Sequence, residues 1–110
     1  MVKKKWVPDA GDVIWINLET TMGHEQAGKR PALVLSPSSY NNRTSLVIAC
    51  AMTSRKKGYP FEVEMPDGGI VLADQVRCLD WRVRRAEPKD TAPPEVVKRV
   101  LMLLGTLLQV

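Results

Sequence analysis

The sequence predicts a mainly β protein, a small antiparallel barrel or strongly curved sheet, with one helix at its C-terminus. Many short apolar or alternating stretches are separated by turn residues, which is typical of short antiparallel strands. Only one stretch, at the C-terminus, has helical periodicity. The 110 residues are 45% hydrophobic and 25% charged, which fits one globular domain spanning residues 1–110.

The first half of the chain predicts strands around one long loop. Residues 13–16 are apolar and mostly β-branched, and the turn-forming residues 8–12 precede them. Residues 19–30 are polar, contain two glycines and have no periodicity, so they predict a loop long enough to carry function. Residues 31–36 predict a second strand, and residues 37–43 a turn or a short helical hook.

The second half predicts a central strand and several short ones. Residues 46–50 are entirely apolar and predict a central strand, whereas residues 54–59 predict a basic polar loop. Further strands are expected at 61–64 and, after a tight turn, at 70–72. Residues 76–85 predict one or two strands with a kink, and Arg82 and Arg84 should lie on one face of this segment.

A helix is expected after Pro93 and Pro94, because proline is tolerated in a first helical turn and Glu95 complements the positive end of the helix dipole. Its apolar residues make a stripe at helical spacing, and others widen that stripe beyond one core-facing side. The sequence therefore predicts a second chain packed against this helix, and hence a homodimer. The stripe consists of Val97, Val100, Leu101, Leu104 and Leu108, widened by Val96, Leu103 and Leu107.

Composition excludes several classes of protein. The net charge of +4 is compatible with a polyanionic partner without requiring one. Two cysteines and one histidine are too few for a structural zinc site, so no metal is expected. No apolar run reaches the roughly 18 residues of a membrane span. The lysines at 3–5 are followed by Pro8 and Asp9 rather than by an apolar signal segment, which predicts a cytoplasmic protein with reduced thiols and no membrane partner.

Two loops concentrate groups that could do chemistry. The segment 23–30 places an imidazole, a carboxylate, an amide and two cations within eight residues, which is either a solvated loop or a ligand site. Pro31 favours a site, because it holds the backbone of Arg30 beside the core. In the second loop, Thr53 precedes three cations, an arrangement suited to a phosphodiester. A strand-end cap for Thr53, and a solvated basic turn for Lys56 and Lys57, are the alternatives.

Other candidates have ordinary structural interpretations beside the functional ones. Arg82, Arg84 and Arg85 are either a charged edge strand or a phosphate-contacting stripe. Asp74 could cap a turn. Trp15 and Trp81 are expected in the core, and Trp6 at the surface near the basic N-terminus.

Taken in order, six motifs resemble the MazF/PemK family, the ribonuclease toxins of bacterial toxin–antitoxin pairs. The segment 23–31, Gly-His-Glu-Gln-Ala-Gly-Lys-Arg-Pro, is similar to the family's Glu-Gln-x-Gly-x-Arg-Pro motif and is the strongest element. The others are the opening segment 8–15, the segment 32–37 with Tyr40-Asn41, Thr53-Ser54 with 57–63, Asp74-Gln75-Val76-Arg77, and Trp81-Arg82.

The resemblance implies a homodimer of SH3-like, PemK-type barrels with a C-terminal helix. It implies a sequence-specific endoribonuclease that needs neither metal nor cofactor and cleaves single-stranded RNA, usually mRNA. The products would carry a 2′,3′-cyclic phosphate and a 5′-hydroxyl. The cognate antitoxin would be the protein partner, covering the RNA groove with an acidic, flexible segment.

The resemblance also assigns residues. The family's catalytic arginine and threonine fall on Arg30 and Thr53, and His24 and Asp74 match catalytic residues of its PemK-like branch. Leu72 departs from that branch, which carries an arginine two residues before the aspartate.

The chemistry of RNA cleavage adds the remaining roles. Arg30 and Thr53 would stabilise charge on the phosphate oxygens, while His24, or alternatively Glu25, would move the protons. The expected RNA-binding residues are Lys29, Arg55, Lys56, Arg82 and Arg84 for phosphates, with Gln26 and the backbone near Gly28 for bases.

Two other functions remain open on the sequence. One is a nucleic-acid-binding homologue without catalysis, since this fold class hosts many binding functions. The other is a toxin of the same fold that acts on DNA gyrase. That class relies on a terminal Trp-Gly-Ile, whereas this chain ends Leu107-Leu108-Gln109-Val110.

Overall fold

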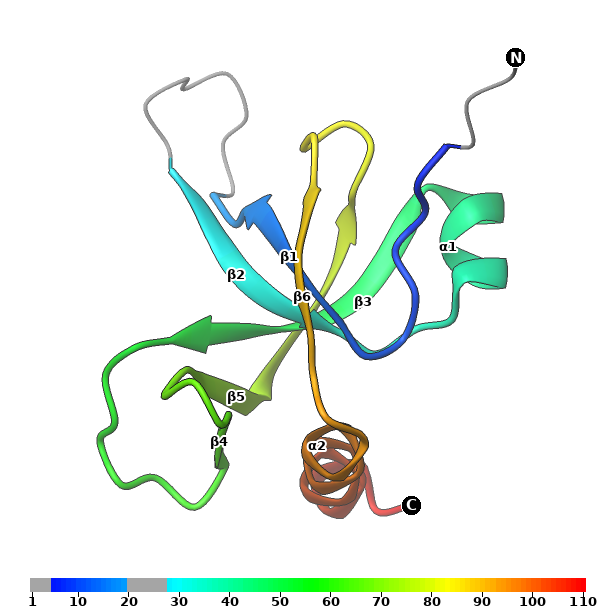
Figure 1. Cartoon of the computed structure of the whole chain (residues 1–110). Coiled ribbons are helices and arrows are strands. Elements are labelled where there is room, and N and C mark those ends of the chain that lie inside the picture. The colour runs from blue at the N-terminus through cyan, green and yellow to red at the C-terminus, as the bar shows by residue number, and fades with distance from the viewer. Residues whose placement is uncertain (1–4, 20–27) are drawn as a thin grey trace.

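The computed structural model describes residues 5–19 and 28–110 and is organised around one antiparallel sheet (Figure 1). The six strands follow the order β4-β5-β3-β2-β1-β6. This confirms a mainly β fold with a C-terminal helix. Closure into a barrel stays a prediction, because no ladder among the described residues joins the edge strands β4 and β6. The elements are β1 (Asp12–Asn17), β2 (Lys29–Val34), α1 (Ser38–Thr44), β3 (Leu46–Thr53), β4 (Glu62–Glu64), β5 (Ile70–Asp80), β6 (Glu87–Thr91) and α2 (Pro94–Leu108).

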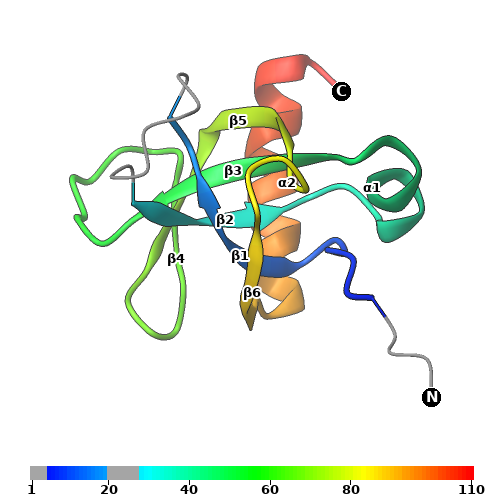
Figure 2. The same cartoon turned by 90° about the horizontal axis from the view of Figure 1, so that it is seen from above.

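The sheet carries a hydrophobic core on each face, because successive residues of a strand point to opposite sides. Val13 and Leu33 belong to the cluster that Val96 and Val100 of α2 cover. Ile14, from the position next to Val13, belongs to the second cluster, which includes Trp81. Figure 2 shows α2 crossing one side of the curved sheet, where it lies against β5 and β4. Among the described residues, no helix is both long and apolar enough to cross a membrane.

The region from Ile70 to Thr91 corrects the sequence-based expectations. β5 is one strand of 11 residues rather than two separate strands. Arg82 and Arg84 lie in the turn that follows it, so they do not share a strand face. β6 was not predicted at all. All five of its residues are exposed, and they include a proline, so neither apolar alternation nor strand propensity marks it.

Two tryptophans also differ from expectation. Trp6 is half-buried. The centroid of its ring lies 5.8 Å from that of the Trp81 ring, in an edge-to-face arrangement. Trp15 is 36% exposed rather than in the core, and the ammonium of Lys89 lies 5.2 Å from its ring centroid. Trp81 is buried, as expected.

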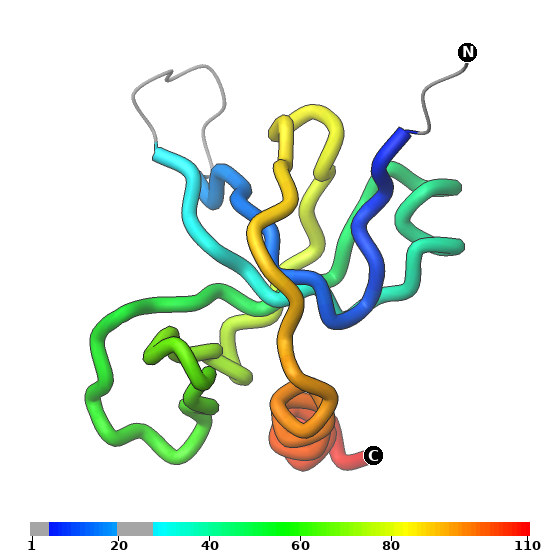
Figure 3. The backbone as a smooth tube through the Cα atoms, viewed as in Figure 1, coloured from blue at the N-terminus to red at the C-terminus, as the bar shows by residue number. Residues whose placement is uncertain are grey.

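The side chain of Asn41 holds α1 against the N-terminal segment, whose course beside α1 Figure 3 shows. Asn41 is fully buried and its amide donates to the carbonyls of Pro8 (2.8 Å) and Ser36 (2.9 Å). Its amide oxygen accepts the Ser36 hydroxyl at 2.6 Å, and its backbone carbonyl accepts the indole N–H of Trp81 at 2.9 Å. One buried residue, through its side-chain amide and its backbone carbonyl, therefore satisfies polar groups from three separate segments.

Asp80, at the end of β5, makes the stability of the fold depend on pH. One carboxylate oxygen accepts the backbone N–H of Val83 (3.0 Å), the hydroxyl of Ser45 (2.8 Å) and the N–H of Arg82 (3.1 Å), which lowers its pKa below the usual 3.8. A lowered native pKa stabilises the fold above the unfolded-state pKa, and the contribution is lost as pH falls through the native pKa.

We therefore expect Asp80→Asn to lower the free energy of unfolding near neutral pH and to matter progressively less below about pH 4. Urea unfolding of both proteins across that range measures the difference. A difference that stayed constant with pH would contradict the assignment.

Candidate active site

Arg30 and Thr53 lie on the adjacent strands β2 and β3. The ladder between these strands ends at the pair Ala32–Ala51, and Arg30 and Thr53 each lie two residues beyond that pair. A two-residue step keeps a side chain on the same face, so both project from one side of the sheet. Thr53 lines the pocket described below, whereas Arg30 is not among the residues that line it.

Arg30 is available to a ligand. It lies in β2 opposite Ile16, and its side chain is exposed. Within the part of the chain that the structure describes, no hydrogen bond or ion pair engages its guanidinium. A rigid strand therefore carries a permanently charged, planar donor group that can bind two phosphate oxygens at once.

The half-buried Thr53 ends β3, and its hydroxyl oxygen accepts the backbone N–H of Arg55 at 3.1 Å. That bond occupies a lone pair and leaves the hydroxyl proton to be donated. Thr53 therefore suits hydrogen bonding to an anionic oxygen.

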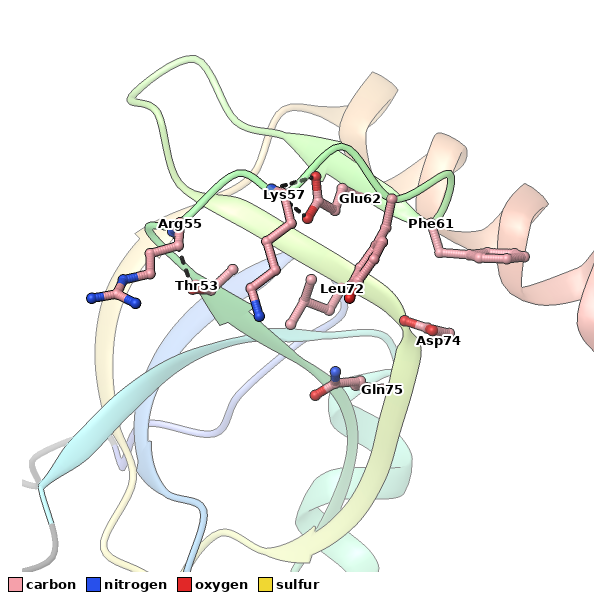
Figure 4. Close-up of a pocket in the computed structure, with 9 residues that line it drawn as sticks. Thr53, Arg55, Lys57, Phe61, Glu62, Leu72, Asp74 and Gln75 are labelled. Carbon is pink, nitrogen blue, oxygen red and sulfur yellow. Dashed lines mark hydrogen bonds between the residues drawn. The ribbon is translucent and has the colours of Figure 1, made fainter.

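A pocket of about 120 Å³ opens beside Thr53 (Figure 4). This volume suits a phosphate or part of a base, since pockets for whole small molecules are about 300–1,000 Å³. The register of β5 against β3 shifts between Cys50 and Met52, which places extra β5 residues here. Asp74 and Gln75 belong to that irregular stretch and reach the pocket. The lining residues are Thr53, Arg55, Lys57, Tyr59, Phe61, Glu62, Leu72, Asp74 and Gln75.

The pocket combines charges of both signs. Arg55 and Lys57 bring cations, whereas Glu62 and Asp74 bring carboxylates. Burial, with a smaller contribution from Asp74, raises the pKa of the Cys50 thiol to about 11. Cys50 is therefore protonated at neutral pH and does not serve as a nucleophile. Within residues 5–19 and 28–110, no three His, Cys, Asp or Glu side chains cluster as metal ligands would.

Several cations expected to bind RNA are engaged within the protein. Lys29 forms an ion pair with Glu87 at 2.9 Å. Arg84 donates to the carbonyls of Asn17 and Glu19, both at 2.7 Å. Together they tie the end of β1 and the start of β2 to the turn after β5 and to the start of β6.

Arg82 and Lys56 are engaged as well. The guanidinium of Arg82 lies 4.4 Å from the Trp81 ring centroid and donates to the side chain of Asn42 at 2.9 Å. Lys56 pairs with Glu64 at 3.0 Å. Of the five cations expected at phosphates, only Arg55 lines the pocket, so RNA contacts by the others stay predictions.

The remaining expected residues lie at or beyond the edge of the described chain. His24, Glu25 and Gln26 fall outside the described residues. Gly28 is exposed, and none of the described residues approaches within 4 Å of the place that a Cβ would occupy there. Lys57 and Glu62 also line the pocket, although a solvated turn was the interpretation preferred for Lys57 and no role was assigned to Glu62.

Fold and site together define a small β-sheet protein with a pocket beside Thr53 that is lined by cationic and carboxylate side chains. The sequence profile of PemK-like, MazF-like toxins of type II toxin–antitoxin systems matches residues 9–108, and the chain belongs to this family.

Individual relatives agree. The chain is 44% identical to the endoribonuclease toxin MazF of Escherichia coli K12 over 107 residues, covering 94% of this chain and 96% of that protein. The crystal structure of MazF from Deinococcus radiodurans is similar with a TM-score of 0.87 and 54% identity, covering 96% of this chain and all of that one. A MazE–MazF crystal structure from the same organism gives a TM-score of 0.88 at 54% identity, covering 96% of this chain and 98% of that one. The chain is thus a homologue of endoribonuclease MazF.

Proposed function

We propose that this protein is a metal-independent, sequence-specific endoribonuclease that acts in the cytoplasm as the toxin of a toxin–antitoxin pair. Its substrate is single-stranded RNA, which it cleaves to a 2′,3′-cyclic phosphate and a 5′-hydroxyl. The observation that carries the proposal is the pocket beside Thr53, which Arg55 and Lys57 also line, together with the exposed Arg30 on the adjacent strand β2.

The reaction uses a nucleophile that the RNA itself supplies. The 2′-oxygen attacks the adjacent phosphorus, a bond forms between them, and the bond from phosphorus to the 5′-oxygen breaks. Negative charge grows on the non-bridging oxygens in the transition state. Arg30 stabilises that charge through its two-pronged donor group, and Thr53 adds a hydrogen bond from its hydroxyl.

Two protons must also move. One leaves the 2′-hydroxyl, and another reaches the departing 5′-oxygen. His24 is the first candidate because an ordinary histidine titrates near pH 6.5, and Glu25 is the alternative base. Asp74, exposed at the pocket, is the third candidate. Full activity in His24→Ala combined with loss in Glu25→Ala would assign the base to Glu25.

The test is incubation of the purified protein with long single-stranded RNA in excess EDTA, followed by mapping of the fragment ends. Discrete cuts with 5′-hydroxyl ends support the proposal and reveal the target sequence. RNA that stays intact, including a mixture of cellular RNAs, would support the non-catalytic alternative. Broken DNA accompanying growth arrest, without RNA fragments, would indicate the gyrase-targeting alternative.

Thr53→Val tests the hydroxyl. Valine keeps the β-branched shape at the end of β3 but cannot donate a hydrogen bond. We expect kcat to fall by about 100-fold, the effect of removing one donor to a developing oxyanion, with KM changed much less. Thr53→Ser, which restores the donor, is the matched control. Equal rates for the valine variant and the wild type would exclude this role.

The antitoxin is the second proposed partner. The support is the Deinococcus radiodurans relative, which has been crystallised with MazE. An acidic segment of a cognate antitoxin would suit the cations of the pocket.

A homodimer is proposed from the apolar surface beside α2. Ile48 is 38% exposed and Leu101 is 48% exposed, and both line one apolar hollow together with Leu35, Tyr40 and Leu104. A second copy of the chain would bury this surface.

Leu101→Lys is expected to convert the dimer to a monomer, because a charge would be placed in the apolar interface. Light scattering after size-exclusion chromatography measures the mass. Lys98→Ala on the same helix is the control. A wild-type mass equal to that of one chain would contradict the homodimer.

A further inference from the structure

One carboxylate holds the loop between β3 and β4. The side chain of Glu62 accepts the backbone N–H of Lys57 at 3.0 Å and that of Gly58 at 2.9 Å. Gly58 has φ = 84°, a conformation that glycine adopts without steric cost and other residues rarely do. Two successive N–H groups can therefore face one carboxylate, and the loop is fixed at this point.

This arrangement determines where Lys57 lies. In Figure 4 its side chain runs from the loop into the pocket, toward Thr53 and Gln75. In residues 5–19 and 28–110 the only ion pairs are Lys29–Glu87 and Lys56–Glu64, so Lys57 has no carboxylate partner there. The neighbouring Lys56 differs from Lys57 because its ammonium forms an ion pair with Glu64.

The negative charge of Glu62, unlike the positive charge of Lys57, is partly compensated by groups of the protein itself. Its carboxylate is half-buried and already accepts backbone N–H groups, so its negative charge is partly compensated inside the protein. An anionic ligand in the pocket meets the ammonium of Lys57, while the loop backbone satisfies Glu62.

We propose that Lys57 binds an RNA phosphate at this pocket and that Glu62 is a positioning residue, which holds Lys57 there through the loop backbone. This inference rests on the proposed function and names a further phosphate contact of the same site.

Glu62 offers a test in which two explanations predict opposite signs. If Glu62 were merely a negative charge on the pocket wall, its removal would strengthen the binding of RNA. If it positions Lys57, its removal weakens binding, because the loop is released and the ammonium is no longer held over the pocket.

The measurement is the affinity for an RNA containing the mapped target with a 2′-deoxy nucleotide at the cleavage site, over a range of salt concentrations. Lys57→Ala should weaken binding roughly fivefold and reduce the slope of log K against log salt by about 0.7, the value for one phosphate contact on a single strand. Glu62→Ala should have the same two effects. The double variant should be no worse than either single variant, since both remove one contact.

Three further variants separate positioning from charge and from folding. Glu62→Gln keeps a carbonyl oxygen that can accept an N–H, so its affinity should lie between those of Glu62→Ala and the wild type. Gly58→Ala changes no charge but strains the loop at positive φ, and it should weaken binding in the same direction as Glu62→Ala. Glu64→Gln, two residues along the same strand, removes an equal charge and should not weaken binding.

Cleavage kinetics give an independent readout. Loss of a contact made in both ground and transition states raises KM and leaves kcat nearly unchanged. Binding by Glu62→Ala or Gly58→Ala as tight as that of the wild type, or additive effects in the double variant, would overturn this inference alone. Failure of the wild type to cleave any RNA would overturn the proposed function and this inference with it.

Discussion

Arg30→Ala should reduce RNA cleavage by about 10³-fold while leaving the protein folded. An arginine that stabilises a phosphoryl transition state is commonly worth about 10³-fold or more in rate. Arg30 is exposed, and no described residue forms a hydrogen bond or ion pair with its guanidinium, so the fold should tolerate its removal. Single-turnover cleavage measures the rate, and thermal unfolding checks the fold.

Arg30→Lys is the matched control for this expectation. Lysine keeps the charge but not the planar pair of donors, so its rate should lie between those of the wild type and of alanine. Cleavage by Arg30→Ala within a few-fold of the wild type would exclude Arg30 from the reaction. A large loss accompanied by a lower melting temperature would instead point to a structural role.

Asn41→Leu should be the most damaging single change to stability. Leucine matches asparagine roughly in size, but it leaves the carbonyls of Pro8 and Ser36 and the hydroxyl of Ser36 without their present partner. Each unsatisfied buried group costs about 1–3 kcal/mol, so we expect the free energy of unfolding to fall by about 3 kcal/mol or more. Urea denaturation measures that loss.

Asn41→Asp and Asn42→Ala are the controls. Aspartate can still accept the Ser36 hydroxyl but cannot donate to the two carbonyls, so it should also be strongly destabilising. Asn42 is exposed, and Asn42→Ala should cost far less. A loss below about 1 kcal/mol for Asn41→Leu would mean that water replaces the missing bonds.

The elements that bury apolar residues could be predicted from the sequence. The β-branched run 13–16 lies in β1, the apolar run 46–50 lies in β3, and the apolar stripe marks α2. β6 could not be predicted, because its five exposed residues, one of them a proline, show no apolar alternation, although they pair with β1 at the edge of the sheet. The sequence also did not predict that β5 is one continuous strand. Its pairing with β3 is irregular next to Cys50, and this irregularity breaks the alternation of apolar and polar residues along β5.

The site was predictable in part. The resemblance assigns Arg30 and Thr53, and the structure adds that they lie on adjacent strands, each two residues beyond the pair Ala32–Ala51. Lys29 and Arg84 looked like cations for RNA, and yet they bind groups 56 to 67 residues away, which no local pattern reveals. Lys57 resembled a solvated turn residue. The glycine that follows it was the available signal that the loop backbone is held in a special conformation.

The central claim is that the RNA supplies the nucleophile while Arg30 and Thr53 stabilise the reacting phosphate. A single 2′-deoxy nucleotide placed on the 5′ side of the mapped cleavage site tests it directly. We expect this RNA to bind with nearly unchanged affinity and to stay uncut at that site, while the all-ribose RNA is cleaved. Cleavage of the deoxy substrate at the normal rate would show that water or a protein group attacks the phosphorus, and would contradict the mechanism.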